Sequence, residues 1–472
     1  MYNARGKNGI QLTSMTANLD NLAQFFRQWD KPVVILDLET TGGNFQRDRI
    51  TEIAFLHFWQ GEITPVSHLV NPTIPIQAFV SQLTGIDDAM VQDAPLWAEL
   101  LPDVLPYLRG SLLIAHNSRF DYTFLRQECR RVGVPFAASA LCSVQLSRKL
   151  YPQFHKHSLD SIIERHGLPI DSRHRAMSDV TALAQFLQLA LHEKGAGAWM
   201  QFASQLYSPR LLPQHLPPKV QAALPLFSDD FGISIWRNAA GEVLNILPHE
   251  HAYREVVALL CRLPAWAAGV AEIAFEAAVG SLHAAVLCAE RRLAFGGVHN
   301  EATGYHTVRW AQADNGALQA QIRPLSAGCF SAPPCGLFAY PKQAKRLLSA
   351  WAAAHGLCPR LLNILPTSIP ADAPCPVVAS GQTCSDACMH NDIAAHNRAV
   401  QAALADFPLG DWGKHARLQI TETDELSQQQ HTWLFHSGAL QRHDGRWHVD
   451  KNIIQIIKHK IKQKHEGVQA AF

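Results

Sequence analysis

Acidic side chains at two nearby positions in the first third of the chain have the spacing of a divalent-metal site. Asp37 and Glu39 stand two residues apart at the end of an apolar, β-branched run. Because side chains alternate along a strand, both carboxylates would lie on one face. Their mutual repulsion is relieved by a bound cation, and paired oxygen ligands suit Mg²⁺ or Mn²⁺.

Three further residues extend this set. Asp121 lies in HNSRFDYTFL, after an apolar run and at the beginning of a helical pattern, while His174 and Asp179 lie in HRAMSDVTALAQFL. Taken alone, each has an ordinary explanation, such as a carboxylate stabilised by a helix dipole or a surface histidine. The order DxETTG, HNxxFD and HxxxxD within one domain-sized stretch favours a shared site instead.

The elements expected around these residues alternate between strand and helix. Apolar runs at 33–38, 50–59 and 111–115 predict strands, and the stretches 121–132 and 178–191 predict helices. This alternation predicts an α/β domain with a mixed sheet.

The first third of the chain also resembles a known nuclease family. The stretch from about Val33 to Leu191 resembles the DEDDh exonucleases, and specifically the proofreading epsilon subunit of bacterial DNA polymerase III. The segment LTGI at 83–86 matches one that this family has between its first two motifs. The resemblance implies a ribonuclease H-like fold, in which helices flank the mixed sheet.

The resemblance implies a two-metal mechanism that removes nucleotides from the 3′ ends of DNA. Two Mg²⁺ or Mn²⁺ ions would lie on either side of the scissile phosphate, one lowering the pKa of the attacking water and the other stabilising the leaving 3′ oxygen. His174 would be the general base, since an imidazole titrates near neutral pH. The ions would be held by four carboxylates, those of Asp37, Glu39, Asp121 and Asp179.

The substrate expected from this resemblance is DNA with a single-stranded or frayed 3′ end. Thr40, Thr41 and Leu83 are candidate contacts to the terminal nucleotide, and Phe120 either stacks on a base or, as we favour, packs in the core. An RNA-processing exonuclease on the same scaffold and a non-catalytic nucleic-acid-binding module are the alternatives. The complete five-residue set favours an enzyme.

The middle of the chain resembles the GIY-YIG nuclease domain of excinuclease C and its Cho homologue. Gly232 and Ile233 match that family, but Ser234 stands where the first tyrosine is needed, and LNIL at 244–247 replaces the second motif. Glu290 keeps the context of the family's metal-binding glutamate. With at least two groups replaced, we expect a degenerate domain that packs, or that binds DNA or a partner, and does not cut. Glu290 is then a surface helix residue.

Four cysteines gather late in the chain in a Pro- and Gly-rich segment that ends in C-x₃-C. Thiolates gathered in a reduced compartment usually bind metal, and this spacing is compatible with zinc or an iron–sulfur cluster. The segment also resembles the region after the GIY-YIG domain of excinuclease C, which implies a [4Fe–4S] cluster, with zinc as the alternative. The candidate ligands are Cys358, Cys375, Cys384 and Cys388.

Bulk properties place these segments in a multidomain chain of 472 residues with a net charge of only +1. No signal peptide or membrane span is visible, so we expect a cytoplasmic protein in DNA repair or replication proofreading, with polymerase or repair proteins as partners. After the GIY-YIG-like α/β domain we expect a mainly helical, Cys-containing region with a basic helix docked at its end. The predicted boundaries are an extension at 1–30, the exonuclease domain at 31–195, a Pro-rich linker at 196–228, the GIY-YIG-like domain at 229–325 and the last region at 326–472.

Overall fold

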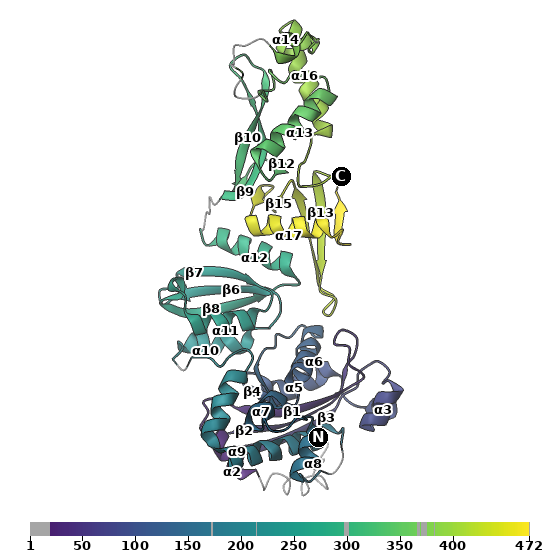
Figure 1. Cartoon of the computed structure of the whole chain (residues 1–472), viewed down its shortest axis with the longest axis vertical. Helices are drawn as coiled ribbons and strands as arrows, with labels where there is room; N and C mark the ends of the chain where they lie inside the picture. Colours follow the sequence, from purple (N-terminus) through teal and green to yellow (C-terminus); the bar gives the residue numbers. More distant parts are fainter. Residues whose placement is uncertain are drawn as a thin grey trace. The chain divides into compact units, whose positions relative to one another are not determined.

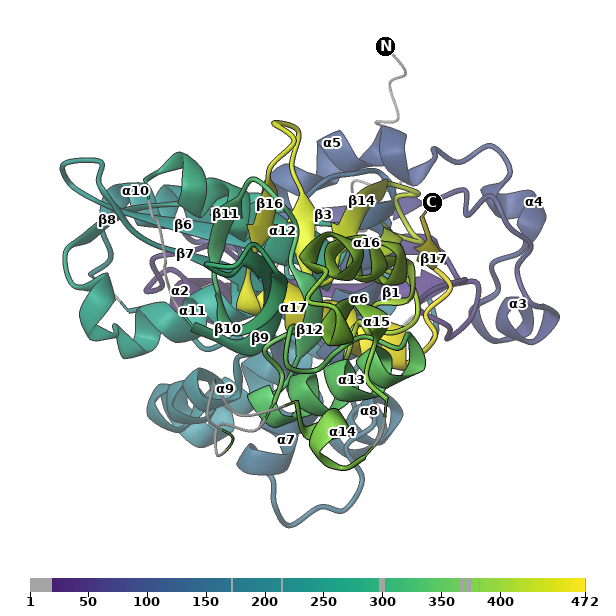
Figure 2. The same cartoon turned by 90° about the horizontal axis from the view of Figure 1, so that it is seen from above.

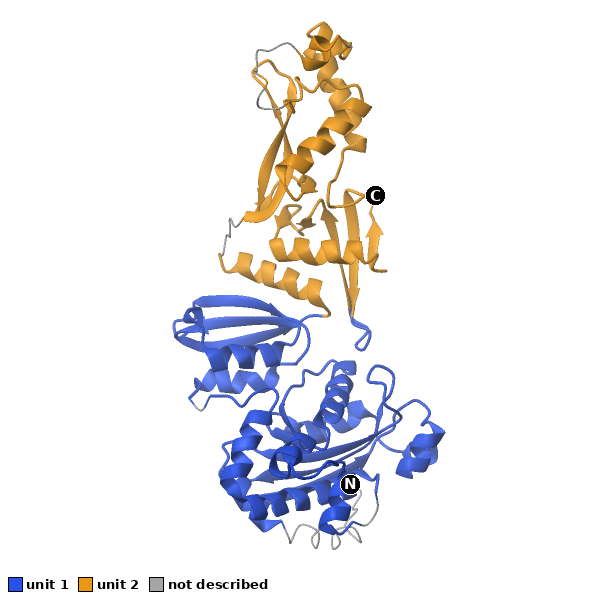
Figure 3. Ribbon diagram, in the orientation of Figure 1, with its two compact units in different colours: residues 1–278, 424–429 blue, residues 279–423, 430–472 orange. Residues whose placement is uncertain are grey.

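The computed structural model describes residues 19–170, 173–213, 215–296, 302–365, 369, 375–381 and 383–471. They form two compact units, which are described separately below (Figure 3). Unit 1 comprises residues 1–278 with 424–429, and unit 2 comprises residues 279–423 with 430–472. Among the described residues, no helix is both long and apolar enough to cross a membrane.

A five-stranded mixed sheet forms the centre of the N-terminal domain, by which we mean residues 19–208. Its order is β3-β2-β1-β4-β5, and Figure 1 labels the strands β1 to β4. The first three strands pair antiparallel, and β4 and β5 extend the sheet in parallel with β1. This confirms the predicted α/β fold with a mixed sheet. The strands are β1 (Val33–Thr40), β2 (Ile50–Trp59), β3 (Glu62–Leu69), β4 (Leu112–Ala115) and β5 (Ser139–Cys142).

Helices cover both faces of this sheet. Val33 and Ile35 of β1 pack into one core cluster with residues of α2, α7 and α9, while Val34 and Leu36 pack into another with residues of α5 and α6. A strand buried on both faces has a nearly continuous apolar sequence, which is why β1 is visible in the sequence. The helices are α2 (Asp20–Phe26), α5 (Trp97–Leu108), α6 (Ser118–Arg131), α7 (Ser143–Leu150), α8 (Leu159–His166) and α9 (Ala176–Leu206).

Two short helices, α3 (Ala78–Thr84) and α4 (Asp88–Val91), complete the N-terminal domain. In the views of Figures 1 and 2, α3 lies at the periphery of the domain.

The N-terminal domain extends beyond both predicted boundaries. Helix α9 continues to Leu206 past a non-helical Gly195, whose φ is +78°. Trp199, in the second half of this helix, is completely buried against the rings of Phe25 and Phe26 from α2. The predicted extension and the first part of the predicted linker therefore contribute to the core. A glycine-centred break in the helical pattern concealed this continuity.

Apart from residues 424–429, the rest of unit 1 is a small domain in which helices pack on a three-stranded sheet. Its strands pair antiparallel in the order β7-β6-β8, with Trp236 and Val256 in the core beneath them. Part of the predicted linker is again helical. The elements are α10 (Pro218–Ala223), η1 (Leu224–Leu226), β6 (Gly232–Asn238), β7 (Val243–His249), α11 (Ala252–Arg262), η2 (Ala265–Ala267) and β8 (Val270–Ala277).

One part of unit 2 joins a long hairpin to the helices around the cysteines. The hairpin strands β9 and β10 pair with each other and with β12, so residues 302–325 lie outside the sheet of β6 to β8. The predicted boundary at 325 does not coincide with a structural one. The elements are β9 (Ala302–Gln312), β10 (Leu318–Ser326), β12 (Cys335–Phe338), α13 (Pro341–Ala354), α14 (Pro376–Ala379), α15 (Asp386–Met389), α16 (Ile393–Ala403) and η3 (Leu404–Asp406).

The other part of unit 2 is a six-stranded sheet with two helices packed on it, so the expectation of a mainly helical region is wrong. Four of the strands have only three residues each, too few for an alternating pattern to stand out in the sequence. The basic helix does dock, since Ile453, Ile454 and Ile457 are completely buried. The elements are α12 (Ser281–Ala294), β11 (Gly328–Phe330), β13 (Arg417–Thr423), β14 (Gln430–His436), β15 (Ala439–Gln441), β16 (Trp447–Val449), α17 (Lys451–Lys462) and β17 (Val468–Ala470).

Candidate active site

Three of the predicted carboxylates converge where β1 meets the beginning of α9. Asp37 and Glu39 follow Val33 and Ile35 at alternate positions of β1 and therefore share their face of the sheet. Asp179 lies in the first turn of α9. One oxygen of each of these carboxylates lies within 4.8 Å of one oxygen of the other two.

Asp121 joins the group from the first turn of α6. Its side chain is buried and accepts a hydrogen bond from the backbone N–H of Leu38, which lies between the two acidic residues of β1. Its charge is close enough to Asp37 to raise the pKa of that residue. The four predicted carboxylates therefore lie together. Three are grouped by the distances between their oxygens, and Asp121 is close enough to affect the pKa of Asp37.

The carboxylates of this cluster are difficult to ionise together. Burial, followed by the charges of Asp121 and Glu39, raises the pKa of Asp37 well above its ordinary value. Burial and Asp179 raise the pKa of Glu39 from 4.5 to about 8, and burial raises that of Asp121 to about 7. Crowded carboxylates that are difficult to ionise together fit an all-oxygen site for Mg²⁺ or Mn²⁺.

The segment before α9 adds an arginine that sequence analysis did not single out. Arg173 donates from Nη1 to Oδ1 of Asp179 and from Nε to Oδ1 of Asp160, the latter at 2.5 Å. The next residue, His174, is half-buried, has a left-handed backbone with φ +59°, and donates its backbone N–H to Asp179. The predicted general base therefore lies beside a metal-ligand candidate.

A buried carboxylate on β2 supports this arrangement and was also missed. Glu52 is the cross-strand partner of Glu39 and accepts hydrogen bonds from Arg175 and from the backbone N–H of Ala176. Its charge contributes to the raised pKa of Glu39. The available signal was a glutamate inside the apolar strand ITEIAFLHFW, where a buried charge needs a partner.

The predicted substrate contacts are only partly exposed. Thr40 donates its hydroxyl to the carbonyl of Gly42 at 2.7 Å, and the buried Thr41 donates to Asp48 at 3.3 Å. These hydroxyls therefore have structural roles in the loop after β1. Phe120 packs against Phe124, in agreement with the favoured core role. Leu83 is exposed on α3 and remains available to a ligand.

Comparison with known proteins decides what this domain is. Residues 34–187 match the family model RNase_T, described as Exonuclease. This segment is an exonuclease domain.

The relatives of the exonuclease domain include DNA polymerases. The chain is 37% identical over 153 residues to DNA polymerase III PolC-type from Caldanaerobacter subterraneus, which is 32% of this chain and 11% of that protein. It is 31% identical over 217 residues to the Bacillus subtilis counterpart, covering 43% of this chain and 15% of that one. The chain thus matches between about a tenth and a seventh of each relative's length.

A solved structure of Exonuclease X in complex with 5′ overhanging duplex DNA is also similar. It is 28% identical, covers 35% of this chain and 99% of that chain, and gives a TM-score of 0.28.

The residues that resemble a GIY-YIG motif have structural roles in β6. A side chain at Gly232 would come within 2.4 Å of the Phe275 ring, and Ile233 is completely buried. Ser234, at the position of the missing tyrosine, bonds the buried ring of His249 at 2.7 Å. Glu290 is exposed on α12 of unit 2, as expected for a surface helix residue.

The four predicted cysteines come together in unit 2. Their four sulfur atoms all lie within 4.8 Å of one another. The Sγ atom of Cys375 is 3.9 Å from the Sγ atom of Cys358 and 3.7 Å from that of Cys384. Burial raises the pKa of Cys375, but backbone N–H groups of Val378 and Val377 outweigh it and lower the pKa overall. Burial raises the pKa of Cys358 and of Cys384 to about 11 and also raises that of Cys388. It is therefore the close grouping of the four sulfurs that suits the tetrad to a metal ion.

Proposed function

We propose that the chain hydrolyses DNA from 3′ ends, using its exonuclease domain, in DNA repair or replication proofreading. The observation that carries this proposal is the convergence of Asp37, Glu39 and Asp179, with Asp121 close enough to raise the pKa of Asp37. The likeness to PolC-type DNA polymerases favours DNA over RNA as the substrate.

The proposed chemistry divides between metal ions and protein groups. Two divalent ions held by the four carboxylates would supply Lewis-acid activation of water and stabilisation of the leaving oxygen. His174 would take the proton of the attacking water, because it lies beside Asp179 at the entrance to α9. A single-stranded or frayed end is the proposed substrate, because the terminal base must leave its partner to enter such a site.

The test uses single-stranded DNA labelled at either end, incubated with the full-length protein in Mg²⁺, Mn²⁺ or EDTA. Metal-dependent stepwise shortening of the 5′-labelled strand is expected, and Asp37→Asn should abolish it. Glu62→Gln, which replaces an exposed carboxylate at the start of β3, is the matched control and should retain activity. Faster shortening of RNA of the same sequence would contradict the assignment to DNA.

We further propose that the GIY-YIG-like segment does not cut and binds DNA or a partner protein. The supporting observation is that Ser234 is fixed in the core by His249 and Trp236, so no tyrosine hydroxyl is present there. Internal cuts by the Asp37→Asn protein in Mg²⁺ or Mn²⁺ would contradict this part of the proposal.

For the cysteine tetrad we propose a [4Fe–4S] cluster, with zinc as the alternative. The close grouping of Cys358, Cys375, Cys384 and Cys388 supports either metal centre. Anaerobic purification followed by visible absorption and metal analysis distinguishes them. Cys384→Ser should lower the bound metal, whereas Cys261→Ser, which alters an exposed cysteine outside the tetrad, should not.

A further inference from the structure

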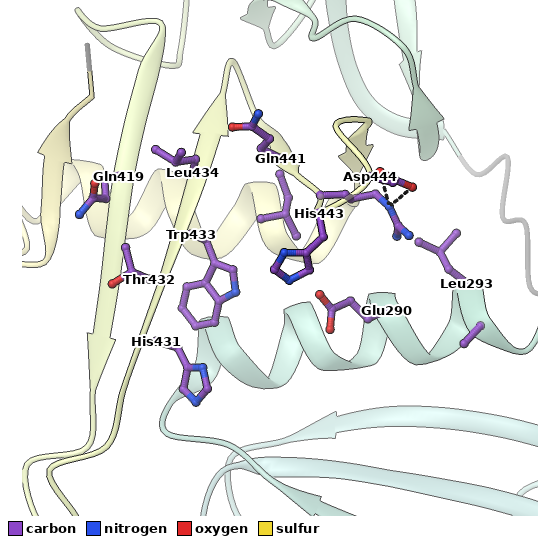
Figure 4. Close-up of a pocket in the computed structure, with 13 residues that line it drawn as sticks. Glu290, Leu293, Gln419, His431, Thr432, Trp433, Leu434, Gln441, His443 and Asp444 are labelled. Carbon is purple, nitrogen blue, oxygen red and sulfur yellow. Dashed lines mark hydrogen bonds and ion pairs between the residues drawn. The ribbon is translucent and has the colours of Figure 1, made fainter.

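A cleft of about 870 Å³ lies in unit 2 between the C-terminal half of α12 and the β14–β15 hairpin. Its lining combines Trp433 and His431 from β14, Glu290 and Leu293 from α12, and Arg442 after β15. Figure 4 shows the Trp433 ring, the His443 imidazole and the Glu290 carboxylate converging on the same space. The volume is in the range of ligand-binding clefts.

Three aromatic rings cluster beside this cleft. The ring of His283, buried at the beginning of α12, lies 3.9 Å from that of His431, measured between centroids. The His431 ring in turn lies 5.8 Å from that of Trp433, with only 17° between their planes. The His283 ring also lies 5.5 Å from that of Trp433, so the three rings form a cluster. Trp433 is half-buried and lines the cleft, where its ring can stack on a flat ligand.

The wall opposite the sheet is held in place by a separate set of contacts. Glu422 accepts the backbone N–H groups of Leu282 and His283 at 3.2 and 2.8 Å and pairs with Lys460 at 3.0 Å. A side chain at Gly280 would come within 2.3 Å of the Glu422 carboxylate, so the glycine permits this close approach. These contacts fix the start of α12 to β13 and α17, so this wall of the cleft is held in place.

The polar groups of the cleft select among flat ligands. Arg442, directly after β15, lines the same cleft as Trp433. Arg442 donates from Nε to Asp444 at 3.2 Å, so its guanidinium is oriented at the rim. A nucleobase stacks on indole and guanidinium planes alike. The Glu290 carboxylate can only accept hydrogen bonds, which favours a base edge with an amino group.

We propose that this cleft binds one base of single-stranded DNA, stacked on Trp433, with Glu290 accepting a hydrogen bond from its exocyclic amino group. The choice of DNA rests on the proposed function of the exonuclease domain. Duplex DNA does not fit the proposal, because a paired base cannot leave its neighbours to stack on Trp433. Cytosine is favoured over thymine, since thymine presents a carbonyl oxygen where cytosine has its amino group.

The binding test uses the full-length protein with Asp37→Asn, in EDTA, so that no DNA is degraded. Oligodeoxycytidine carrying one 5-iododeoxycytidine is photocrosslinked, and the modified peptides are identified by mass spectrometry. Crosslinks within residues 430–444 are expected. Crosslinks confined to the exonuclease domain would overturn the proposal.

Fluorescence anisotropy with matched oligonucleotides tests the individual contacts. Trp433→Ala should weaken binding of oligodeoxycytidine by about tenfold, the order expected for one stacked base, while Trp433→Phe should keep most of it. Glu290→Gln, at an exposed helix position, should remove the preference for oligodeoxycytidine over oligothymidine. Equal affinities for the two oligonucleotides before substitution, or tighter binding of RNA, would overturn the proposal. If the proposed function is wrong, the unsubstituted chain will not shorten DNA in Mg²⁺. That result is separate from these binding measurements.

Discussion

Arg175 donates two hydrogen bonds to the carboxylate of Glu52, from Nε to Oε2 at 3.1 Å and from Nη2 to Oε1 at 2.8 Å. The same Oε2 accepts the backbone N–H of Ala176, the first residue of α9, at 3.0 Å. Glu52 is also the cross-strand partner of Glu39. One buried carboxylate therefore fixes the helix that positions Asp179 to the strand that faces Glu39.

Glu52→Gln is expected to lower kcat more than it changes KM. The amide cannot accept both hydrogen bonds of Arg175, so the start of α9 and the adjacent His174 lose their fixed position relative to β1. Small displacements of catalytic groups reduce rates steeply, and we expect a loss in kcat on the order of tenfold. The free energy of unfolding should fall by about 1–3 kcal/mol. Steady-state kinetics and urea denaturation measure the two effects.

Glu128→Gln is the matched control for this prediction. Glu128 is equally buried and is bonded by Arg49 at 2.6 and 2.9 Å, but it lies on α6 and not at the start of α9. A similar loss of stability with a smaller loss of kcat is expected. Equal losses of kcat in the two variants would contradict a positioning role for Glu52.

The metal-free exonuclease domain should become less stable as the pH rises from about 4.5 to about 8. Burial and neighbouring carboxylates raise the pKa of Glu39 from 4.5 to about 8, so the folded state retains a proton that the unfolded chain releases. Where the folded state binds more protons, stability falls with increasing pH. Thermal unfolding in EDTA across this range measures the fall.

Two comparisons identify the source of this pH dependence. Glu39→Gln should reduce the slope of the curve in EDTA without removing it, because the pKa of Asp121 is also raised, to about 7. Glu62→Gln, at an exposed position, should leave the slope unchanged. Mn²⁺ should restore stability most at the alkaline end, because the ligands must be deprotonated to bind it. If the stability of the unsubstituted protein does not change with pH, the neighbouring charges do not raise the pKa of Glu39 as expected.

Arg173→Ala is expected to strengthen the binding of Mn²⁺. The guanidinium of Arg173 occupies one oxygen of Asp179 and repels a cation, and the substitution removes both effects. A dissociation constant lower by about tenfold corresponds to about 1.4 kcal/mol, a plausible value for one charged hydrogen bond. Isothermal titration calorimetry measures it, with the exposed Arg27→Ala as control. Weaker binding by Arg173→Ala would show that this arginine assists the metal.

The carboxylate cluster could be predicted because its members lie in regular elements with strong local patterns. Asp37 and Glu39 end a strand that is apolar on both faces, so their alternation and their position were visible together. Asp179 begins a strongly periodic helix. The partners Glu52 and Arg175 are separated by 123 residues, and no local pattern indicates that they meet.

The architecture of the later regions was harder to predict for a different reason. Strands such as β11 and β17 have three residues each, and they join the six-stranded sheet by pairing with distant segments, β11 with β16 and β17 with β13. The Ile-rich spacing of α17, by contrast, was sufficient to predict its docking, because a helix of 12 residues shows its apolar face directly.

Trp199→Ala tests whether the second half of α9 belongs to the exonuclease domain. The indole is completely buried, with its ring centroid 5.1 Å from that of Phe25 and 6.0 Å from that of Trp29. Removing a buried tryptophan leaves a cavity and should lower the free energy of unfolding by about 3–5 kcal/mol. Met200→Ala alters the next, exposed position and should cost under about 1 kcal/mol. Urea denaturation of both variants provides the comparison. If both substitutions lower the free energy of unfolding by the same small amount, the domain ends near Gly195. In that case the Trp199 side chain lies outside the core, and its removal leaves no cavity.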